Sequence, residues 1–272
     1  MKHAIMVLGS GNDAEILQKL INHFDDSEID FFIHWDQKYR LPNLKSQKSQ
    51  IKFVPRIKVY WGTSTLVYAE KRLLECVYNS HKEYNYVHLI SSTDIPLMTR
   101  QYFKKFFNKE LYLGFVPVNK KDIQRLSFYY PIDHLNIRNS GFFIGIIKVL
   151  NIIFHINRLK DKNIVPMKGS QWFSIQGKFL PIILKYNNMD IFKHSFLSDE
   201  TYLQTILSNY RPSQLIDDNE MAARYIDWNR GTPYTFTEKD IPELKQVINT
   251  KFAFARKVRD ASLIDKLFIS DK

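Results

Sequence analysis

The sequence predicts an α/β protein, with a doubly wound, mainly parallel sheet flanked by helices in a single domain of residues 1–272. Short apolar runs alternate with segments of helical periodicity through residues 1–116, in the order βαβ(β)αβαβ. That alternation is typical of parallel sheets covered by helices. Glycines or carboxylates follow several of the apolar runs, and an apolar content of 44% over 272 residues is enough for one large core.

The first strand is predicted over residues 4–8, a continuous apolar run that ends at Gly9-Ser10-Gly11. These glycines lack the full G-x-G-x-x-G spacing, so a plain turn is favoured over a phosphate cradle. Asp13 is expected to cap the following helix, whose apolar face comprises Ile16, Leu17, Leu20, Ile21 and Phe24. Residues 29–33 form a second strand that ends just before Asp36, a candidate ligand contact or a turn residue.

Residues 39–50 are polar and predict a surface loop, followed by short strands over residues 51–54 and 57–61. Trp61-Gly62 then leads into a helix with Ser64 as the expected cap. Residues 86–90 form the next buried strand, and Asp94 again follows its end. Pro96 stops the strand, and a helix over 99–107 and a strand over 111–116 follow. The ligand is therefore expected over the strand ends, near Gly9, Asp36 and Asp94.

Residues 117–165 break this pattern because they are basic and aromatic. Within them, residues 141–159 are apolar almost all round a helix, interrupted by Lys148, Asn151 and His155. A buried helix is the favoured interpretation. A helix lying in a membrane interface is the second, supported by basic residues at 158, 160 and 162. A membrane-spanning helix is disfavoured by Lys148 and by the short length.

The second half of the chain is organised around residues 168–175, a Gly-Ser turn that runs into a short strand. Ser198-Asp199-Glu200 reads as a helix start, with Ser198 as its N-cap. A glutamate at a helix entrance beside a cleft is a candidate general base, although spacing alone favours a simple cap. Further strands are predicted over residues 223–228 and 252–255, and a helix with a box-like cap begins at residue 237.

The chain carries 39 Lys and Arg against 28 Asp and Glu, a net charge of +11. Such a surplus suggests a polyanionic partner, which could be nucleic acid, a phosphorylated substrate or an anionic membrane. No nucleic-acid-binding motif is visible, so we expect no nucleic-acid partner. Cys76 is the only cysteine, which fits a reducing compartment. The eight histidines are scattered and the carboxylates after the strands are single, so no metal site is expected.

Several stretches, taken in order, carry a family resemblance. They are Ile33-His34-Trp35-Asp36, Trp61-Gly62 with Ser64 and Ala69-Glu70, Leu89-Ile90-Ser91-Ser92-Thr93-Asp94-Ile95-Pro96-Leu97, Gly169-Ser170-Gln171-Trp172, Asp199-Glu200, Arg224-Tyr225-Ile226-Asp227-Trp228 and Phe254-Ala255-Arg256-Lys257. Their order and spacing resemble the core-2/I-branching N-acetylglucosaminyltransferase family, which includes the peptide O-xylosyltransferases. The resemblance covers roughly residues 3–260.

The resemblance implies a GT-A-like fold and an inverting, metal-independent transfer from a UDP-sugar. By position, Glu200 matches the catalytic base, and Arg224, Arg256 and Lys257 match cations that hold the diphosphate. Fixed Arg and Lys can supply the positive charge that a leaving diphosphate needs. The nucleotide or sugar pocket is then expected to be lined by Gly9, Asp36, Trp61, Gly62, Asp94, Ser170 and Trp172. Trp172 either stacks on a sugar face or belongs to the core.

The chain also departs from the family, because animal members carry a membrane anchor, a stem and many cysteines that are not seen here. A compact bacterial-type enzyme is therefore expected in the cytoplasm, peripheral on the inner face of the membrane. It would move GlcNAc, xylose or another hexose from a UDP-sugar donor to a saccharide or lipid-linked saccharide acceptor, in surface polysaccharide or lipid-linked oligosaccharide synthesis.

In this scheme residues 1–116 bind the nucleotide and residues 166–272 form the catalytic and acceptor half. Acceptor choice is expected in residues 117–165, which match the family least. Two alternatives stay open. One is a non-catalytic nucleotide- or carbohydrate-binding relative, and the other is a basic RNA-binding α/β protein suggested by the charge alone.

Overall fold

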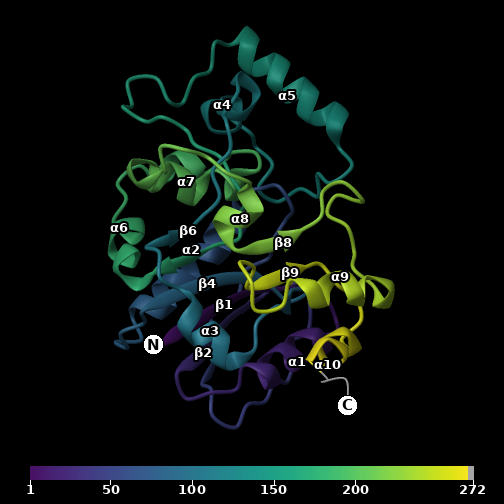
Figure 1. Cartoon of the computed structure of the whole chain (residues 1–272). Helices are drawn as coiled ribbons and strands as arrows, with labels where there is room; N and C mark the ends of the chain where they lie inside the picture. Colours follow the sequence, from purple (N-terminus) through teal and green to yellow (C-terminus); the bar gives the residue numbers. More distant parts are fainter. Residues whose placement is uncertain (269–272) are drawn as a thin grey trace.

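Four parallel strands form the centre of the fold in a computed structural model that describes residues 1–268. The larger sheet has the order β3-β2-β1-β4-β7-β6, and its last two strands run antiparallel to their neighbours. A smaller sheet has the order β5-β9-β8 (Figure 1). The strands are β1 (His3–Gly9), β2 (Ile29–Trp35), β3 (Ile51–Phe53), β4 (Tyr86–Ser91), β5 (Ile95–Pro96), β6 (Leu111–Tyr112), β7 (Ser174–Gln176), β8 (Arg224–Ile226) and β9 (Phe254–Arg256).

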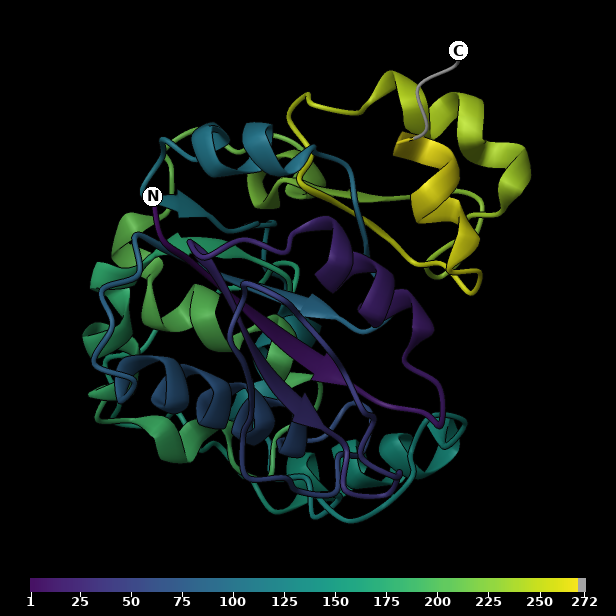
Figure 2. The same ribbon diagram turned by 90° about the horizontal axis from the view of Figure 1, so that it is seen from below.

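Helices cover both faces of the larger sheet, with α1 on one side and α2 on the other (Figure 2). The α-helices are α1 (Glu15–His23), α2 (Thr65–Tyr78), α3 (Arg100–Phe106), α4 (Lys120–Ser127), α5 (Gly141–Ile153), α6 (Leu180–Leu184), α7 (Tyr202–Ile206), α8 (Asp218–Ala222), α9 (Ile241–Gln246) and α10 (Ser262–Phe268). Single 3₁₀ turns span Gly177–Phe179, Met189–Phe192, Ser198–Glu200, Ser208–Tyr210 and Glu238–Asp240.

The two cores follow from the alternation of side chains along β1. Ile5 and Val7 pack on the side of α1, the smaller sheet and α10, whereas Ala4 and Met6 pack on the side of α2, α6 and α7. All four side chains are fully buried. A strand covered on both faces must be apolar throughout, which is why residues 4–8 form an unbroken apolar run. The predicted doubly wound α/β fold is therefore confirmed.

Most predicted elements of the first half are present. The strands expected at 4–8, 29–33, 51–54 and 86–90 correspond to β1, β2, β3 and β4. The Asp13 Oδ1 atom accepts a hydrogen bond of 2.9 Å from the Glu15 amide at the start of α1.

In the second half, the box-like cap at residue 237 is confirmed, because Thr237 and Asp240 hydrogen-bond reciprocally.

The strand predicted over residues 57–61 is wrong. These residues are irregular, and their amides bond to side chains rather than to a neighbouring strand. The Ile57 amide donates to His34 Nε2 at 3.0 Å, and the Val59 amide donates to Asp36 Oδ1 at 3.2 Å. Side chains at the end of β2 therefore satisfy the backbone groups that a β-ladder would otherwise use.

The strand predicted over residues 111–116 is shorter than expected, since β6 ends at Tyr112. Gly114 interrupts it by packing against another segment of chain. A Cβ atom on Gly169 would lie 1.9 Å from the Gly114 carbonyl oxygen, so the two backbones are in direct contact there. Only glycine permits such an approach at position 169.

The two predicted serine caps are also wrong. Ser64 occupies the N-cap position of α2, but its Oγ donates to Asp133 instead of accepting from the helix. Ser198 lies inside the Ser198–Glu200 turn, behind Leu197 in the left-handed region at φ 50°. Its buried Oγ has no hydrogen-bond partner among residues 1–268. Tertiary contacts override the local capping preference at both sites.

The apolar segment after residue 141 is not the buried helix that the sequence favours. Helix α5 ends at Ile153, and its buried residues are only Ile144, Ile147 and Asn151. In Figure 1, α5 lies at the outer edge of the molecule beyond α4. Within residues 1–268, no helix has both the length and the apolar character needed to cross a bilayer.

A polar chain crosses the core between β1, β4 and β7. His3 Nδ1 lies 3.0 Å from His88 Nε2, and His88 Nδ1 lies 2.8 Å from Ser174 Oγ. Both histidines are fully buried. Burial lowers the pKa of His3 to about 4 and holds the pKa of His88 well below its ordinary value. Both imidazoles are therefore neutral in the folded protein at neutral pH.

We expect the protein to lose stability as the pH falls below about 6.5, the ordinary pKa of histidine. The unfolded chain binds protons there that the folded chain rejects, so each pH unit costs up to about 1.4 kcal/mol per histidine. His3 alone should remove about 3 kcal/mol of the free energy of unfolding by pH 4. Urea unfolding at a series of pH values measures this slope. A His3→Gln variant with the same slope as the wild type would contradict this origin.

Candidate active site

A pocket of about 470 Å³ lies over the carboxyl ends of β1 and β2, where open α/β sheets bind ligands. Of the residues predicted to bind nucleotide or sugar, Gly9, Asp36 and Trp61 line it. The Asp36 amide donates to the Gly9 carbonyl at 2.8 Å, which joins the two strand ends. A Cβ atom on Gly9 would lie 2.1 Å from the ring of Trp35, so glycine is required there.

Asp36 organises the wall of this pocket. Its Oδ1 accepts from the Lys38 and Val59 amides at 3.0 and 3.2 Å, and its Oδ2 lies 3.3 Å from Lys38 Nζ. Lys38 Nζ also lies 4.7 Å from the centre of the Tyr60 ring. The carboxylate is thus bound by groups of this chain, and it holds the loop before Trp61 in place.

Sequence reasoning missed Arg138, which also lines the pocket. Its guanidinium lies 5.8 Å from the centre of the Trp61 ring. Arg138 belongs to the irregular part of residues 117–165, where no periodicity or motif marks it. A larger cavity of about 950 Å³ opens at the amino end of β4, lined by residues such as Tyr78 and Lys82, and contains none of the predicted site residues.

Glu200, the predicted base, sits at the end of the Ser198–Glu200 turn. Two motifs hold this turn through main-chain hydrogen bonds. The Gly169 amide donates to the Glu200 carbonyl at 2.9 Å, and the Leu197 amide donates to the Gly62 carbonyl at 2.8 Å. The Trp61-Gly62 and Gly169-Ser170 stretches therefore converge on Glu200 although they are far apart in the sequence.

The Glu200 side chain is partly exposed, at 36% of its surface, and its Oε2 accepts from Arg125 Nη1 at 2.5 Å. Arg125 comes from α4 and also lies 3.4 Å from Asp122. Neither Arg125 nor α4 was predicted from the sequence. A carboxylate that is oriented by an arginine and still open to solvent can accept a proton from a bound hydroxyl.

Two further carboxyl groups lie behind Glu200. Burial raises the pKa of Asp199 to about 7, with the charge of Glu200 as the next cause. Burial also raises the pKa of the fully buried Glu70 well above its ordinary value, and Asp199 adds to that shift. The Glu70 oxygens and Asp199 Oδ1 have no hydrogen-bond partner among residues 1–268. Glu200 is thus the exposed member of this acidic group.

The predicted cation Arg256 stands between Asp94 and Trp172. Its Nε lies 3.7 Å from Asp94 Oδ1, and its guanidinium lies 3.9 Å from the centre of the Trp172 ring. Asp94 in turn accepts from the amide and hydroxyl of Ser91 at 3.0 and 2.5 Å, at the carboxyl end of β4. Burial lowers the pKa of Arg256, and Asp94 opposes that shift.

Lys257 extends this positive region toward the pocket. Burial lowers the pKa of its ammonium group, and the positive charges of Arg256, Arg138 and Arg259 lower it further. No side-chain hydrogen bond or ion pair joins Lys257 to another of residues 1–268. Lys257 therefore experiences repulsion from the neighbouring positive charges, which a bound polyanion would relieve.

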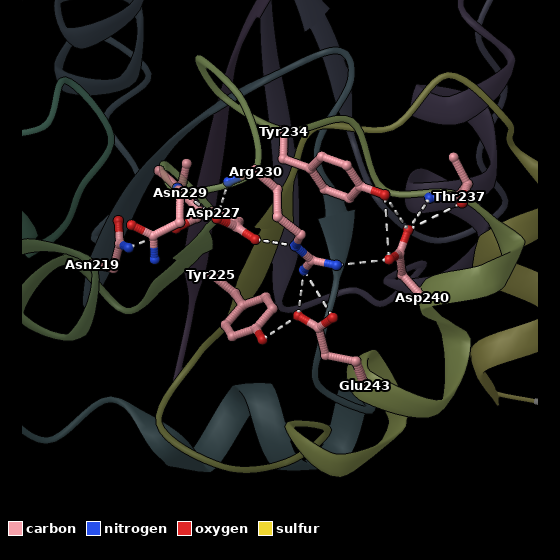
Figure 3. A network of polar contacts seen from close by, with 10 residues as sticks. Asn219, Tyr225, Asp227, Asn229, Arg230, Tyr234, Thr237, Asp240 and Glu243 are labelled. Atoms are coloured by element: carbon pink, nitrogen blue, oxygen red, sulfur yellow. Dashed lines mark hydrogen bonds and ion pairs between the residues drawn. The ribbon is translucent and has the colours of Figure 1, made fainter.

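A polar network around Arg230 braces the loop after β8 (Figure 3). Arg230 bonds to Asp227, to Asp240 at 2.9 Å and to Glu243 at 2.8 Å. This network braces the loop from which the Tyr234 carbonyl and the Phe236 amide bond to the backbone of Lys257 at 3.4 and 2.9 Å. The Arg224-Tyr225-Ile226-Asp227-Trp228 motif therefore positions Lys257 through Asp227.

Arg224, predicted to hold the diphosphate, is fully buried. Its terminal nitrogens donate to the carbonyls of Phe173, Leu89 and Ala222 at 2.5, 3.1 and 2.9 Å, and to Ser174 Oγ. Burial lowers its pKa to about 9. This side chain joins β8 to the larger sheet and has no surface open to a ligand in this conformation.

One short segment connects the base to the cations. Gly169 bonds to Glu200, the Ser170 amide bonds to Asp218 Oδ1 at 3.2 Å, and the Trp172 ring contacts Arg256. Gly169 and Trp172 are three residues apart, which limits their separation to about 11 Å. The structure thus brings Glu200, Ser170, Trp172, Arg256 and Asp94 into one region.

No group of three or more His, Cys, Asp and Glu side chains suited to a metal ion occurs within residues 1–268. The two carboxylates that follow the strands are already engaged, Asp36 by Lys38 and Asp94 by Ser91 and Arg256. Lys38 and Arg256 place positive charge beside these two carboxylates.

Comparison with known proteins adds an independent observation. The family model described as Core-2/I-Branching enzyme matches residues 3–248. Two curated proteins named Xylosyltransferase oxt, from Drosophila melanogaster and Drosophila pseudoobscura pseudoobscura, are each 20% identical to the chain over 286 positions. The matches cover 93% of this chain, which spans about a third (31%) of the length of each relative.

Proposed function

The chain belongs to the Core-2/I-Branching enzyme family, whose members are glycosyltransferases, and we propose that it performs an inverting, metal-independent transfer from a UDP-sugar to a hydroxyl of a saccharide acceptor. This proposal depends mainly on the segment 169–174. The segment contacts Glu200, whose carboxylate is open to solvent, at one end and Arg256, with its neighbouring cations, at the other. An acid–base group beside a polycationic site is what single displacement of a nucleoside diphosphate requires.

In the proposed reaction Glu200 takes the proton of the acceptor hydroxyl as its oxygen attacks the anomeric carbon. The bond between that carbon and the UDP oxygen breaks, and its electron pair leaves with the diphosphate. Attack from the face opposite UDP inverts the configuration. Arg125 holds the Glu200 carboxylate in place through its 2.5 Å hydrogen bond. Such a base contributes about 10²–10⁴-fold to the rate.

Arg256 and Lys257 stabilise the negative charge that develops on the departing diphosphate. Arg256 is held by Asp94 and Trp172, so it needs little reorganisation during the reaction. We add Arg138 to this set because it lines the pocket and its charge acts on Lys257. Arg224 has a structural role. Its guanidinium donates to the carbonyl of Phe173 and so joins β8, and the paired strand β9, to the larger sheet.

The proposed metal independence is supported by the donor set. A divalent cation prefers several free oxygen ligands, whereas Asp94 already accepts from Ser91 and lies beside the positive charge of Arg256. The UDP moiety fits the pocket over β1 and β2, near Asp36 and Trp61. We further propose that the acceptor is a saccharide or a lipid-linked saccharide. The reaction would then belong to the synthesis of a surface polysaccharide or a lipid-linked oligosaccharide, and it would take place in the cytoplasm.

Slow hydrolysis of the donor tests this proposal without a known acceptor. We expect the purified protein to release UDP from one member of a panel containing UDP-GlcNAc, UDP-xylose and other UDP-hexoses, in the presence of EDTA. The preferred donor identifies the transferred sugar. The same panel with Mn²⁺ in place of EDTA is the matched control.

Release that occurs only with Mn²⁺ would overturn the assignment of charge stabilisation to Arg256 and Lys257. Saturable UDP binding with no release from any donor, and no transfer to saccharide acceptors, would favour a non-catalytic nucleotide-binding relative. Both readouts are independent of any membrane or lipid.

A further inference from the structure

An apolar surface covers α5 and the residues that follow it, an area that the proposed reaction does not use. Its members are large side chains with high exposed fractions, led by Phe142 at 85%, Phe154 at 67% and Ile153 at 59%. The α5 surface, as we name it, comprises Phe142, Phe143, Ile146, Val149, Leu150, Ile152, Ile153, Phe154 and Ile156. Contiguous exposed apolar side chains of this kind mark an interaction site.

The opposite face of α5 holds the helix on the protein. Ile144 and Ile147 pack into a small core formed by Phe128, Tyr130, Ile132 and Ile137. Asn151 fixes the helix further, because its side chain bonds to the amide and carbonyl of Tyr129 at 2.7 and 2.9 Å. These contacts fix one face of α5 against the protein and therefore leave the apolar side chains of its other face exposed.

A groove of about 390 Å³ runs along the exposed face. It is lined by Phe142, Gly145, Ile146, Val149 and Leu150, and almost all of its surface is apolar. Gly145 has open space where a side chain would project, which leaves a gap between the larger residues. The shape and the apolar lining of this groove suit an acyl chain.

The charged residues between positions 134 and 160 all have one sign. Residues 134–160 contain no aspartate or glutamate, but they contain Arg138, Lys148, Arg158 and Lys160. Arg158 is engaged with the carbonyls of Asp190 and His194, whereas Arg138 and Lys160 are exposed and Lys148 is half-buried. Of the carboxylates next to this stretch, Asp133 is buried and lies 2.6 Å from His194 Nδ1, whereas Asp161 is exposed. Basic side chains thus border the apolar face.

We propose that the α5 surface docks on an anionic membrane, with the helix lying in the plane of the interface. Apolar side chains flanked by Lys and Arg are the pattern of interfacial helices, which bury their apolar face about 5–10 Å into the headgroup region. The 13 residues of α5 extend only about 20 Å, less than the roughly 30 Å of a bilayer core. The helix therefore lies on the membrane rather than across it.

Charge favours a membrane over a second copy of this chain as the occupant. The α5 surface has no carboxylate of its own between residues 134 and 160, and the whole chain carries +11. Two copies meeting through this surface would bring like charges together. Anionic headgroups instead attract each basic residue near them with about 1 kcal/mol.

Docking would also place the pocket close to the membrane. Arg138 lines the pocket over β1 and β2, and α5 begins three residues later at Gly141. A lipid-linked acceptor could then reach the pocket without leaving the bilayer. This last consequence rests on the proposed function, whereas the docking itself does not.

Flotation with vesicles tests the docking on the full chain. At low salt we expect the protein to float with vesicles of phosphatidylcholine and phosphatidylglycerol, and to float much less with phosphatidylcholine alone. High salt should weaken the interaction. The triple variant F142S/I146S/V149S should reduce the vesicle partition coefficient at least about tenfold. A matched triple variant of exposed apolar residues elsewhere, V165S/I182S/I216S, should leave it unchanged.

Absence of flotation with anionic vesicles at low salt would overturn the proposal. An equal loss of vesicle binding in both triple variants would also overturn it, because binding would then depend on exposed apolar residues anywhere on the protein. A wild-type dimer that the α5 variant dissociates, without any vesicle binding, would show that a second copy covers this face. UDP release by the variants in solution, compared with the wild type, shows separately whether the active site is intact.

Discussion

The Glu200→Gln variant is expected to transfer sugar about 10³-fold more slowly than the wild type, with its fold and UDP affinity retained. Glutamine keeps the size of the side chain but cannot accept the proton of the acceptor hydroxyl. The main-chain hydrogen bonds from Gly169 and to Gly62, which hold the turn, do not depend on the carboxylate. The loss should therefore fall on the chemical step, measured as UDP release and as transfer to a saccharide acceptor.

The matched control is Glu110→Gln, which alters an exposed glutamate paired with Lys178 at the opposite end of the sheet. It should leave the rate unchanged. Thermal unfolding and calorimetric titration with UDP establish that both variants fold and bind. A Glu200→Gln enzyme that works within a few-fold of the wild type would remove Glu200 from the role of base.

The second large effect is expected for Lys257→Met, which should lower both UDP affinity and the transfer rate, together by about 10²-fold. This corresponds to about 3 kcal/mol of charge stabilisation. Lys257 makes no side-chain hydrogen bond or ion pair within residues 1–268, and burial, followed by its positive neighbours, lowers its pKa. Removing the charge relieves repulsion in the free protein, so we expect no loss of thermal stability. UDP titration and donor hydrolysis measure the two parts of the effect.

The control for Lys257 is Lys251→Met, which removes a lysine that pairs with Glu220 outside the pocket. Arg256 is a poorer choice, because its replacement would leave the buried Asp94 without its positive partner. If Lys257→Met bound UDP and turned over donor like Lys251→Met, the diphosphate would have to lie elsewhere.

The sequence predicts the central part of the fold well because its signals are local. The run over residues 4–8 is apolar throughout and that over 86–90 is apolar except for His88, because β1 and β4 are covered on both faces. Asp36 and Asp94 follow the ends of parallel strands, so their position near one edge of the sheet follows from topology. The Core-2/I-Branching resemblance that these stretches suggested agrees with the family found over residues 3–248.

The remaining features depend on contacts between distant residues, which spacing does not reveal. Arg224 lies in a predicted strand, yet only the packing of the smaller sheet against the larger one shows that its guanidinium meets the carbonyls of Leu89 and Phe173. Arg125 and Arg138 come from a region without a motif and reach the site through tertiary packing. Serine is a residue type favoured at helix N-caps, but Leu197 adopts a left-handed conformation and the Ser198 side chain is buried.

The main-chain attachment of the Ser198–Glu200 turn has a consequence for engineering this enzyme. Because backbone groups of Gly62 and Gly169 hold the turn, nearby side chains can vary without moving the proposed base. A combinatorial library at exposed positions such as His134, whose ring lies 6.3 Å from that of the pocket residue Tyr60, and Asn136, which lines the pocket, would therefore vary the pocket while the proposed base keeps its place. Arg125 and Arg138 would be kept constant, and Gly169 would tolerate no exchange at all.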